Sequence, residues 1–329
     1  MPIMKFMKKI PGGLMVVPFF IAAIINTLFP QVLQIGTMTT AFFSQSGATT
    51  LLAMALFCTG TQLKVREAPE VLKRSGVLLV AKFLAGFIIG LLVGKFAGPN
   101  GLFGISALAI FGAVTNSNAG MYVALMGEYG DDKDIAAVSL LAINDGPFLT
   151  LVAMGAAGVA DIPVLMIVST IVPMIVGCIL GNLDQELAEF FKPVGFAAVP
   201  MFSFCLGAGI DFRMLLLSGL PGILLGVITI VASGGLCFLA DRFINRRPGY
   251  AGVAISTAAA NAVGTPATLA ATIPSLAAIA EGATAQIATA VIFTAIVTPL
   301  ITGWVAKKAG CPKMDRLKAA SQAGAQTWQ

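Results

Sequence analysis

The chain alternates between long apolar runs and short polar connectors over almost its whole length. Apolar runs of about 18 residues or more are long enough to cross the hydrocarbon core of a bilayer as helices. We therefore predict an all-α membrane protein with ten transmembrane helices. The runs lie near residues 11–29, 44–63, 76–94, 101–121, 136–157, 163–181, 194–213, 219–240, 250–272 and 285–305.

The composition agrees with this prediction. Hydrophobic residues make up 57% of the chain and charged residues 11%, whereas soluble domains carry about 25% charged residues. Lys5, Lys8 and Lys9 precede the first apolar run as in a signal peptide, but no clear small-x-small cleavage site follows. We expect an uncleaved first helix in a chain embedded in a lipid bilayer.

The residue types present exclude several function classes. The sequence has no histidine, which is the commonest proton shuttle and metal ligand. The five cysteines lack paired spacing, so we predict neither a disulfide framework nor a zinc site. There is no P-loop, which argues against ATP-driven transport. We therefore expect no metal, no cofactor and no enzymatic activity.

The basic residues predict the orientation of the chain. With the N-terminus in the cytoplasm, seventeen of the twenty lysines and arginines fall on the cytoplasmic side. Lys95 and Arg213 fall on the other side, and Lys82 lies in the inner part of the third run. This asymmetry follows the positive-inside rule and predicts that both termini are cytoplasmic. The net charge of +5 reflects the same bias and indicates no nucleic-acid partner.

Three short motifs occur twice, in the same order. Phe57-Cys58-x-Gly60 returns 147 residues later as Phe204-Cys205-x-Gly207; Pro147 to Thr150 and Ile10-Pro11 return 152 residues later as Pro299 to Thr302 and Ile162-Pro163. Five spans per copy is an odd number, so the second copy is inverted, as in many secondary transporters. We predict one five-helix repeat over residues 1–160, an inverted repeat over 161–306 and a polar cytoplasmic tail over 307–329.

The fourth run contains the richest polar cluster, which is Thr115, Asn116, Ser117 and Asn118 followed by Ala119-Gly120. Asn and Ser side chains compete for backbone hydrogen bonds, so this segment is a poor continuous helix. We predict an interrupted helix that lines a polar cavity. The alternative is that these side chains only form hydrogen bonds between helices.

The ninth run has a matching interruption at Ala260-Asn261-Ala262-Val263-Gly264-Thr265-Pro266, where proline disfavours helix at Thr265. Two broken helices at equivalent repeat positions indicate a binding site near the middle of the membrane. Their half-helix N-termini attract a carboxylate. We predict that the hydroxyl and amide side chains of both interruptions, namely Thr115, Asn116, Ser117, Asn118, Ser256, Asn261 and Thr265, bind a polyhydroxylated substrate.

Asp145, which follows Asn144 in the fifth run, is the only carboxylate near the middle of a predicted span. A buried carboxylate without a partner is costly, which favours a proton carrier or a ligand for a coupling cation. We assign proton coupling to Asp145 and Asn144. The alternative is that Asp145 is a structural cap where Gly146-Pro147 bends the helix.

Other polar residues are weaker candidates. Gln62 follows the first copy of the Phe-Cys motif and could contact substrate, although Gly60 is at least as well explained by close helix packing. Lys82 and Asp211 lie near span ends, and we expect both to snorkel to an interface. The acidic connector Asp131-Asp132-Lys133-Asp134 and the segment Asp184 to Glu186 are expected to be solvated loops.

Several motifs resemble the bacterial 2-keto-3-deoxygluconate permease family over about residues 9 to 305. They are Ile10-Pro11-Gly12-Gly13, Gly181 to Leu187, Gly222 to Val227, Ser117 to Tyr122 and Gly146-Pro147. The resemblance implies a proton-coupled symporter in the bacterial inner (plasma) membrane that imports 2-keto-3-deoxygluconate, an acidic sugar.

The resemblance also implies the fold of bile-acid sodium symporters and sodium/proton antiporters. In that fold discontinuous helices four and nine cross, and a core moves against a panel, here spans one, two, six and seven. This chain departs from the family pattern, which can carry an acid at the position of Thr115 and Glu-Ser in place of Asn144-Asp145. A shift of one residue turns a helical side chain by about 100°.

The leading hypothesis is therefore a sugar-acid:proton symporter that works by alternating access. The second hypothesis is a sodium-coupled symporter of a related organic anion, with Asn116, Asn118 and Asp145 as sodium ligands. A channel is disfavoured because the polar residues concentrate on the fourth, fifth and ninth runs instead of forming a continuous stripe.

Overall fold

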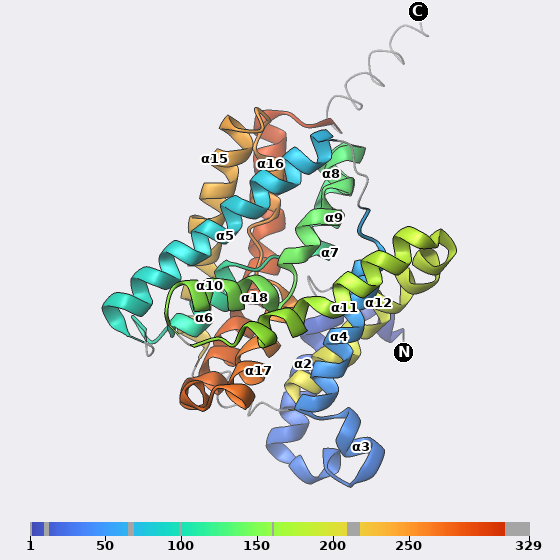
Figure 1. Cartoon of the computed structure of the whole chain (residues 1–329), viewed down its shortest axis with the longest axis vertical. Coiled ribbons are helices and arrows are strands. Elements are labelled where there is room, and N and C mark those ends of the chain that lie inside the picture. The colour runs from blue at the N-terminus through green and yellow to red at the C-terminus, as the bar shows by residue number, and fades with distance from the viewer. Residues whose placement is uncertain are drawn as a thin grey trace, which may run out of the picture.

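The computed structural model describes residues 2–9, 13–64, 69–98, 101–159, 161–208 and 218–312, and the regular structure of these residues is helical (Figure 1). The first half comprises α1 (Ile3–Lys9), α2 (Gly13–Leu28), η1 (Pro30–Leu33), α3 (Thr37–Phe42), α4 (Gln45–Thr61), α5 (Pro69–Ala97), α6 (Ala107–Val114), α7 (Ala119–Tyr129), α8 (Asp132–Ala136), α9 (Val138–Leu141), η2 (Ala142–Asn144) and α10 (Pro147–Ala156). The second half comprises α11 (Val164–Leu183), α12 (Gln185–Gly207), α14 (Gly219–Ile228), η3 (Thr229–Gly234), α15 (Gly235–Phe243), α16 (Tyr250–Ala254), η4 (Ala260–Gly264), α17 (Thr265–Thr272), η5 (Pro274–Leu276) and α18 (Ala277–Ala309).

Several of these helices suit a membrane. Within the described residues, four helical segments are long and apolar enough to cross one: Pro69–Ala97, Gln185–Cys205, Gly219–Phe243 and Pro274–Ala309. A fifth results if Asp132–Asn144 and Pro147–Ala156, which meet at an angle of 54°, form one bent span. Shorter apolar helices cover parts of the first, second and sixth predicted runs. The all-helical membrane class is confirmed, while the ten-span inverted repeat remains a prediction.

One group of helices consists of α2, α4, α11 and α12, which pack on one another (Figure 1). Glycines allow their backbones to touch: a Cβ atom at Gly60 of α4 would lie 2.2 Å from the carbonyl oxygen of Met174 in α11. A Cβ atom at Gly177 would lie 2.1 Å from the carbonyl oxygen of Phe57. Gly60 is therefore a packing residue. These four helices are the ones that the family resemblance implies for the panel.

The second group contains α5, α6 and the helices from α14 to α18. Here α5 contacts α6 and α15, and α18 contacts α6, α14, α16 and α17. In Figure 1 this group occupies the left of the molecule, and α4, α11 and α12 lie to its right. One apolar cluster joins the two groups, because it includes Phe19 of α2, Met174 of α11 and Phe111 of α6.

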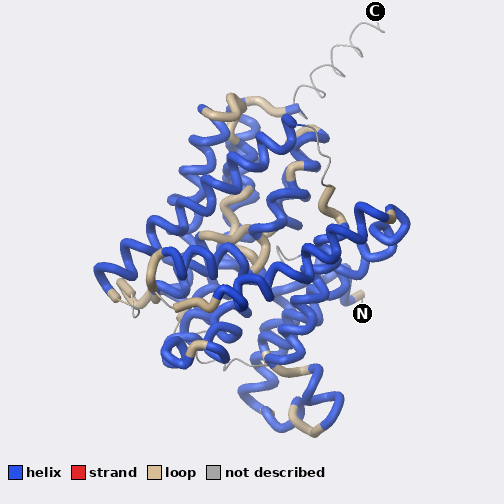
Figure 2. The backbone as a smooth tube through the Cα atoms, in the orientation of Figure 1, coloured by secondary structure: helices blue, strands red, loops and turns tan. Residues whose placement is uncertain are grey.

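Both predicted interruptions are present, and Figure 2 shows loop segments in the middle of the second group. The fourth run is broken between α6 and α7, at residues 115–118. The ninth run is broken between α16 and α17, at residues 255–264, which include the short helix η4. A third irregularity is the π-helical turn η3 in the eighth run. Such turns are frequent at functional sites.

Some details of the sequence prediction are wrong. Thr265 is helical, because Pro266 stands in the first turn of α17, where its missing N–H group has no partner to lose. The break in the ninth run begins at Ile255, five residues before the predicted interruption at Ala260, and ends at Gly264. Residues 307–309, which the prediction assigns to the tail, continue the helix α18. Asp211 lies outside the described residues.

Candidate functional site

The break in the fourth run begins a new helix at Asn118. This residue has extended backbone angles, and its side-chain oxygen accepts the N–H of Met121 at 2.9 Å. It is therefore the N-cap of α7, and it supplies one of the acceptors that the first turn of a helix requires. The cluster predicted from sequence thus does interrupt the helix, and α7 presents its N-terminus at the interruption.

The two interruptions meet. The backbone N–H of Asn118 donates to Thr257 Oγ1 at 3.0 Å. On either side of this contact α16 packs on α7, and α17 packs on α6, so the two broken helices cross. We call this region the crossing, and it comprises residues 115–120, 144–146 and 255–265.

Asp145 joins the crossing from a third segment, between η2 and α10. Its Oδ2 atom accepts the N–H of Ala119 at 3.0 Å, at the N-terminus of α7. The Asn261 amide donates to Asp145 Oδ1 at 3.2 Å and to the Asp145 carbonyl oxygen at 3.1 Å. The alternative role expected for Asp145 from the sequence is a structural cap. The carboxyl group does cap a helix, but this helix is α7 and not α10, which Gly146-Pro147 begins.

The exposure of the candidate residues divides them into two sets. Asn118, Ala119, Asp145 and Asn261 are partly exposed, and Gly120 is exposed. These five residues form the accessible surface of the crossing. The other candidates there are buried, namely Thr115, Asn116, Ser117, Asn144, Ser256 and Thr265. A ligand that reaches the crossing in this conformation meets the first set.

The buried set holds the breaks in shape. Asn116 Nδ2 donates to Thr150 Oγ1 at 2.6 Å and to the Gly112 carbonyl oxygen at 2.9 Å. Asn144 Nδ2 donates to Ser117 Oγ at 3.3 Å. The amide oxygens of Asn116 and Asn144 and the hydroxyl of Thr265 are buried without a hydrogen-bond partner. Buried polar atoms without a partner are unusual in folded proteins.

Lys82 corrects the sequence analysis. It was expected to snorkel to an interface, but its side chain is fully buried. Its Nζ atom donates to Ser233 Oγ at 2.8 Å, in the π-helical turn η3, and to the Thr257 carbonyl oxygen at 3.1 Å. A buried ammonium group therefore lies at the crossing. A lysine inside an apolar run was the available signal, but only the packing of α5 against η3 and the ninth run reveals its partners.

Thr257 and Thr150 were also missed. Thr257 stands directly after Ser256, so its sequence position was a usable signal. Thr150 lies in the first turn of α10 and reaches the crossing only through the bend at Gly146-Pro147. Gln62 was predicted to contact substrate, but its amide donates to Thr61 Oγ1 at 2.8 Å and to the Ala188 carbonyl oxygen at 2.7 Å. It links α4 to α12 and is not brought together with the other candidates.

The acidic connector is the second correction. Asp134 was expected to be solvated, but it is fully buried and accepts hydrogen bonds from Arg74 at 2.9 Å, from Tyr250 at 2.9 Å and from Arg247 at 2.5 Å. Arg74 also donates to Asp131 at 2.8 Å. We call these five residues the ion cluster. It fastens α5 and α8 to the segment that joins α15 to α16. Asp184, Gln185 and Glu186 are exposed, as predicted, but Gln185 and Glu186 begin α12 instead of forming a loop.

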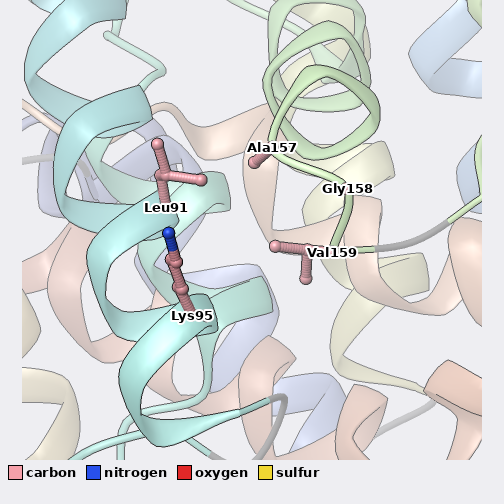
Figure 3. A pocket seen from close by; sticks show the side chains of 6 residues that line it. Leu91, Lys95, Ala157, Gly158 and Val159 are labelled. Carbon is pink, nitrogen blue, oxygen red and sulfur yellow. The ribbon is translucent and has the colours of Figure 1, made fainter.

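A pocket of about 320 Å³ lies away from the crossing, between the C-terminal part of α5 and the residues that follow α10 (Figure 3). Leu91, Gly94 and Lys95 line one side, and Ala157, Gly158 and Val159 line the other. None of the predicted site residues lines it.

Crossed broken helices that bring polar groups together inside an all-helical membrane protein are typical of secondary transporters. This class agrees with the comparisons. The chain belongs to the 2-keto-3-deoxygluconate permease family, whose family model matches residues 4–311. It is a membrane transport protein and not an enzyme.

Curated relatives match over nearly their whole length. The chain is 48% identical to "2-keto-3-deoxygluconate permease 1" of Salmonella typhimurium over 308 residues, which cover 94% of this chain and 96% of that protein. It is 38% identical over 314 residues to "2-keto-3-deoxygluconate permease" of Bacillus subtilis, with 94% of each chain covered. Identity to the protein of that name from Xanthomonas axonopodis pv. citri is 37% over 316 residues, with 94% and 98% covered.

Proposed function

We propose that this protein imports 2-keto-3-deoxygluconate together with a proton, by alternating access. The names of the relatives, which match over 94% of this chain, support the substrate. The coupling ion and the mechanism are argued from the crossing. We also propose, from the charge pattern, that the chain lies in the bacterial inner membrane with both termini in the cytoplasm.

The observation that carries the proposal is the position of Asp145. This carboxylate bonds to the N-terminus of α7 in the first half and to Asn261 in the second half. A change in its charge therefore alters contacts between two broken helices at once. Asp145 is also partly exposed, so a proton can reach it in this conformation. A proton carrier needs both properties.

The substrate contacts are assigned to the partly exposed set. The N-terminus of α7 favours a carboxylate, because its first N–H groups point outward and the helix dipole is positive there. The amides of Asn118 and Asn261 suit the hydroxyl groups of a sugar acid, since each amide has donors and an acceptor. The buried polar residues hold the two helix breaks in shape and do not contact the substrate themselves.

Alternating access requires two bodies that move against each other. We assign α2, α4, α11 and α12 as the panel, and the second group together with α7 to α10 as the moving core. The direct backbone contacts at Gly60 and Gly177 favour a rigid panel. The predicted five-helix repeats give each body helices from both halves of the chain.

The test is uptake of labelled 2-keto-3-deoxygluconate by proteoliposomes that contain the purified protein. We expect accumulation under an inwardly directed proton gradient, and none when the gradient is collapsed by a protonophore. Asp145→Asn should abolish accumulation and leave exchange of labelled for unlabelled substrate. Asp161→Asn changes an exposed acid in a connector and serves as the matched control. Full gradient-driven accumulation by Asp145→Asn would refute the proton role.

A sodium-coupled symporter of a related organic anion is the second candidate. It is favoured by the two buried amide oxygens without partners, at Asn116 and Asn144, because sodium ions bind oxygen ligands. The same proteoliposomes decide between the two. Accumulation under a sodium gradient at equal internal and external pH supports the second candidate, and its absence supports proton coupling.

A further inference from the structure

The N-terminus of α7 already holds a carboxyl group, that of Asp145. Asp145 Oδ2 accepts the Ala119 N–H, the first of the helix. An anionic ligand at this N-terminus would compete for this donor and would lie beside the Asp145 carboxyl group. Two like charges at contact distance in a poorly solvated site repel each other strongly. The ionised Asp145 and a substrate carboxylate therefore exclude each other.

We propose that Asp145 competes with the substrate for the N-terminus of α7. In the empty protein the Asp145 carboxylate binds there. When Asp145 is protonated, the substrate carboxylate binds there instead. The inference rests on the proposed function and specifies how coupling occurs. A neutral carboxyl group is a much weaker acceptor than a carboxylate. The Ala119 N–H then turns to the substrate anion, which accepts it in place of Asp145.

Several observations at the crossing point to a ligand. The N-terminus of α7 is accessible beside Asp145, because Ala119 and Asp145 are partly exposed and Gly120 is exposed. Directly beside Asp145, the buried Asn144 reaches Ser117 at the break with its amide nitrogen, while its amide oxygen has no partner. The site thus combines an accessible helix N-terminus, a displaceable carboxyl group and, beneath them, a buried acceptor without a partner.

Among the described residues, no charged side chain forms a hydrogen bond with the carboxyl group of Asp145. The hydrogen-bond partners that the structure gives it are the uncharged Ala119 N–H and Asn261 amide. Leu56 of α4 faces Gly146. Lys82 of α5 is the buried cation at the crossing, but it bonds to Thr257 and Ser233, and it reaches α7 only through the Thr257 contact with Asn118.

The exchange conserves the charge of the crossing. If Lys82 and Asp145 are both ionised in the empty protein, their charges sum to zero. In the loaded protein Asp145 has gained one proton and the substrate has brought one negative charge, so the sum is again zero. The core therefore moves through the membrane with the same net charge in both states. Neither the proton nor the anion can be carried alone without leaving a buried net charge, which is costly. Coupling follows from this constraint.

The test is calorimetric binding of 2-keto-3-deoxygluconate and of its neutral carboxamide to the purified full-length protein. We expect acid affinity to fall by up to about tenfold per pH unit above the pH at which Asp145 ionises, since one proton is linked to one anion. Carboxamide affinity should not change with pH. Asp145→Asn should bind the acid with an affinity that is independent of pH. A constant acid affinity in the wild type, or loss of acid binding in Asp145→Asn, overturns the inference.

A second variant tests the shared donor. Ala119→Pro deletes only the contested N–H, because proline is tolerated at the first helical position and Asn118 already has extended angles. We expect acid affinity at low pH to fall by about tenfold or more, with carboxamide affinity unchanged. Gly127→Ala, further along α7 and outside the crossing, keeps every N–H and is the control. Equal losses for acid and carboxamide contradict the exchange. If the wild type does not bind the acid at any pH, the proposed substrate is wrong. This result differs from the ones that contradict the exchange.

Discussion

The ammonium group of Lys82 lies 3.1 Å from the carbonyl oxygen of Thr257, 175 residues further along the chain. This contact brings a full positive charge to the carbonyl groups that follow the short helix α16. Cations at helix C-termini are favourable, because the last carbonyl groups lack intrahelical partners. No carboxylate within the described residues pairs with this lysine in an ion pair. The charge is therefore kept at an energetic cost, which is typical of functional residues inside membranes.

Lys82→Met is expected to separate function from stability. Removal of a buried charge without an ionic partner relieves its desolvation, so the melting temperature in detergent should rise or stay unchanged. Uptake should fall by about tenfold or more, since the charge balance of the crossing is lost. Lys95→Met, on an exposed residue of the same helix, is the control. A lower melting temperature together with normal uptake would show that Lys82 is only structural.

The sequence predicts much of this site because its signals are local. The polar run after Thr115 and the acid at Asp145 stand out against apolar neighbours. What the sequence does not predict depends on contacts between distant segments. Thr257 matters because its hydroxyl accepts the Asn118 N–H, and Asp134 is buried because two arginines from other segments reach it. Periodicity places a residue on a helix, but it does not say which helix covers it.

The ion cluster predicts acid sensitivity. Burial raises the pKa of Asp131, but the hydrogen bonds from Arg74 and from the Asp134 N–H together lower it by more. The pKa of Asp131 therefore lies below its usual value. A folded-state pKa below the unfolded value of about 3.9 stabilises the fold above that pH, and the contribution is lost as the pH falls through the folded-state pKa. The wild-type melting temperature should therefore drop at the acid end of a pH series.

Asp131→Asn isolates this effect, because asparagine can still cap α8 as Asp131 does. The variant should be less stable than the wild type near neutral pH, and the difference should shrink as the pH falls below about 4. Asp132→Asn changes an exposed neighbour and should leave the curve unchanged. A difference in melting temperature that stays constant over the whole pH series would argue against the ionic contribution.

Gly60→Ala is expected to disrupt the proposed panel. Its Cβ atom would lie 2.2 Å from the Met174 carbonyl oxygen, so α4 and α11 must separate. Packed interiors yield little, and we expect a loss of about 1–3 kcal/mol or more. Gly127→Ala, in α7, meets nothing within 4 Å and should stabilise slightly, by up to about 1 kcal/mol, because alanine favours helix. Melting curves in detergent compare the two, and similar behaviour would contradict backbone packing at Gly60.

Thr150 should matter through its hydroxyl alone. Its Oγ1 atom accepts the Asn116 amide at 2.6 Å and lies 3.1 Å from Thr115 Oγ1. Thr150→Val keeps the shape and removes these bonds, which should cost about 1–3 kcal/mol of stability and slow uptake by loosening the break between α6 and α7. Thr150→Ser restores the hydroxyl and should recover most of both. Thr170→Val, in α11, loses only a local bond to Ile167 and serves as the control. Uptake and melting temperature are measured on all three variants. If Thr150→Val matches Thr170→Val in both, the hydroxyl does not support the crossing.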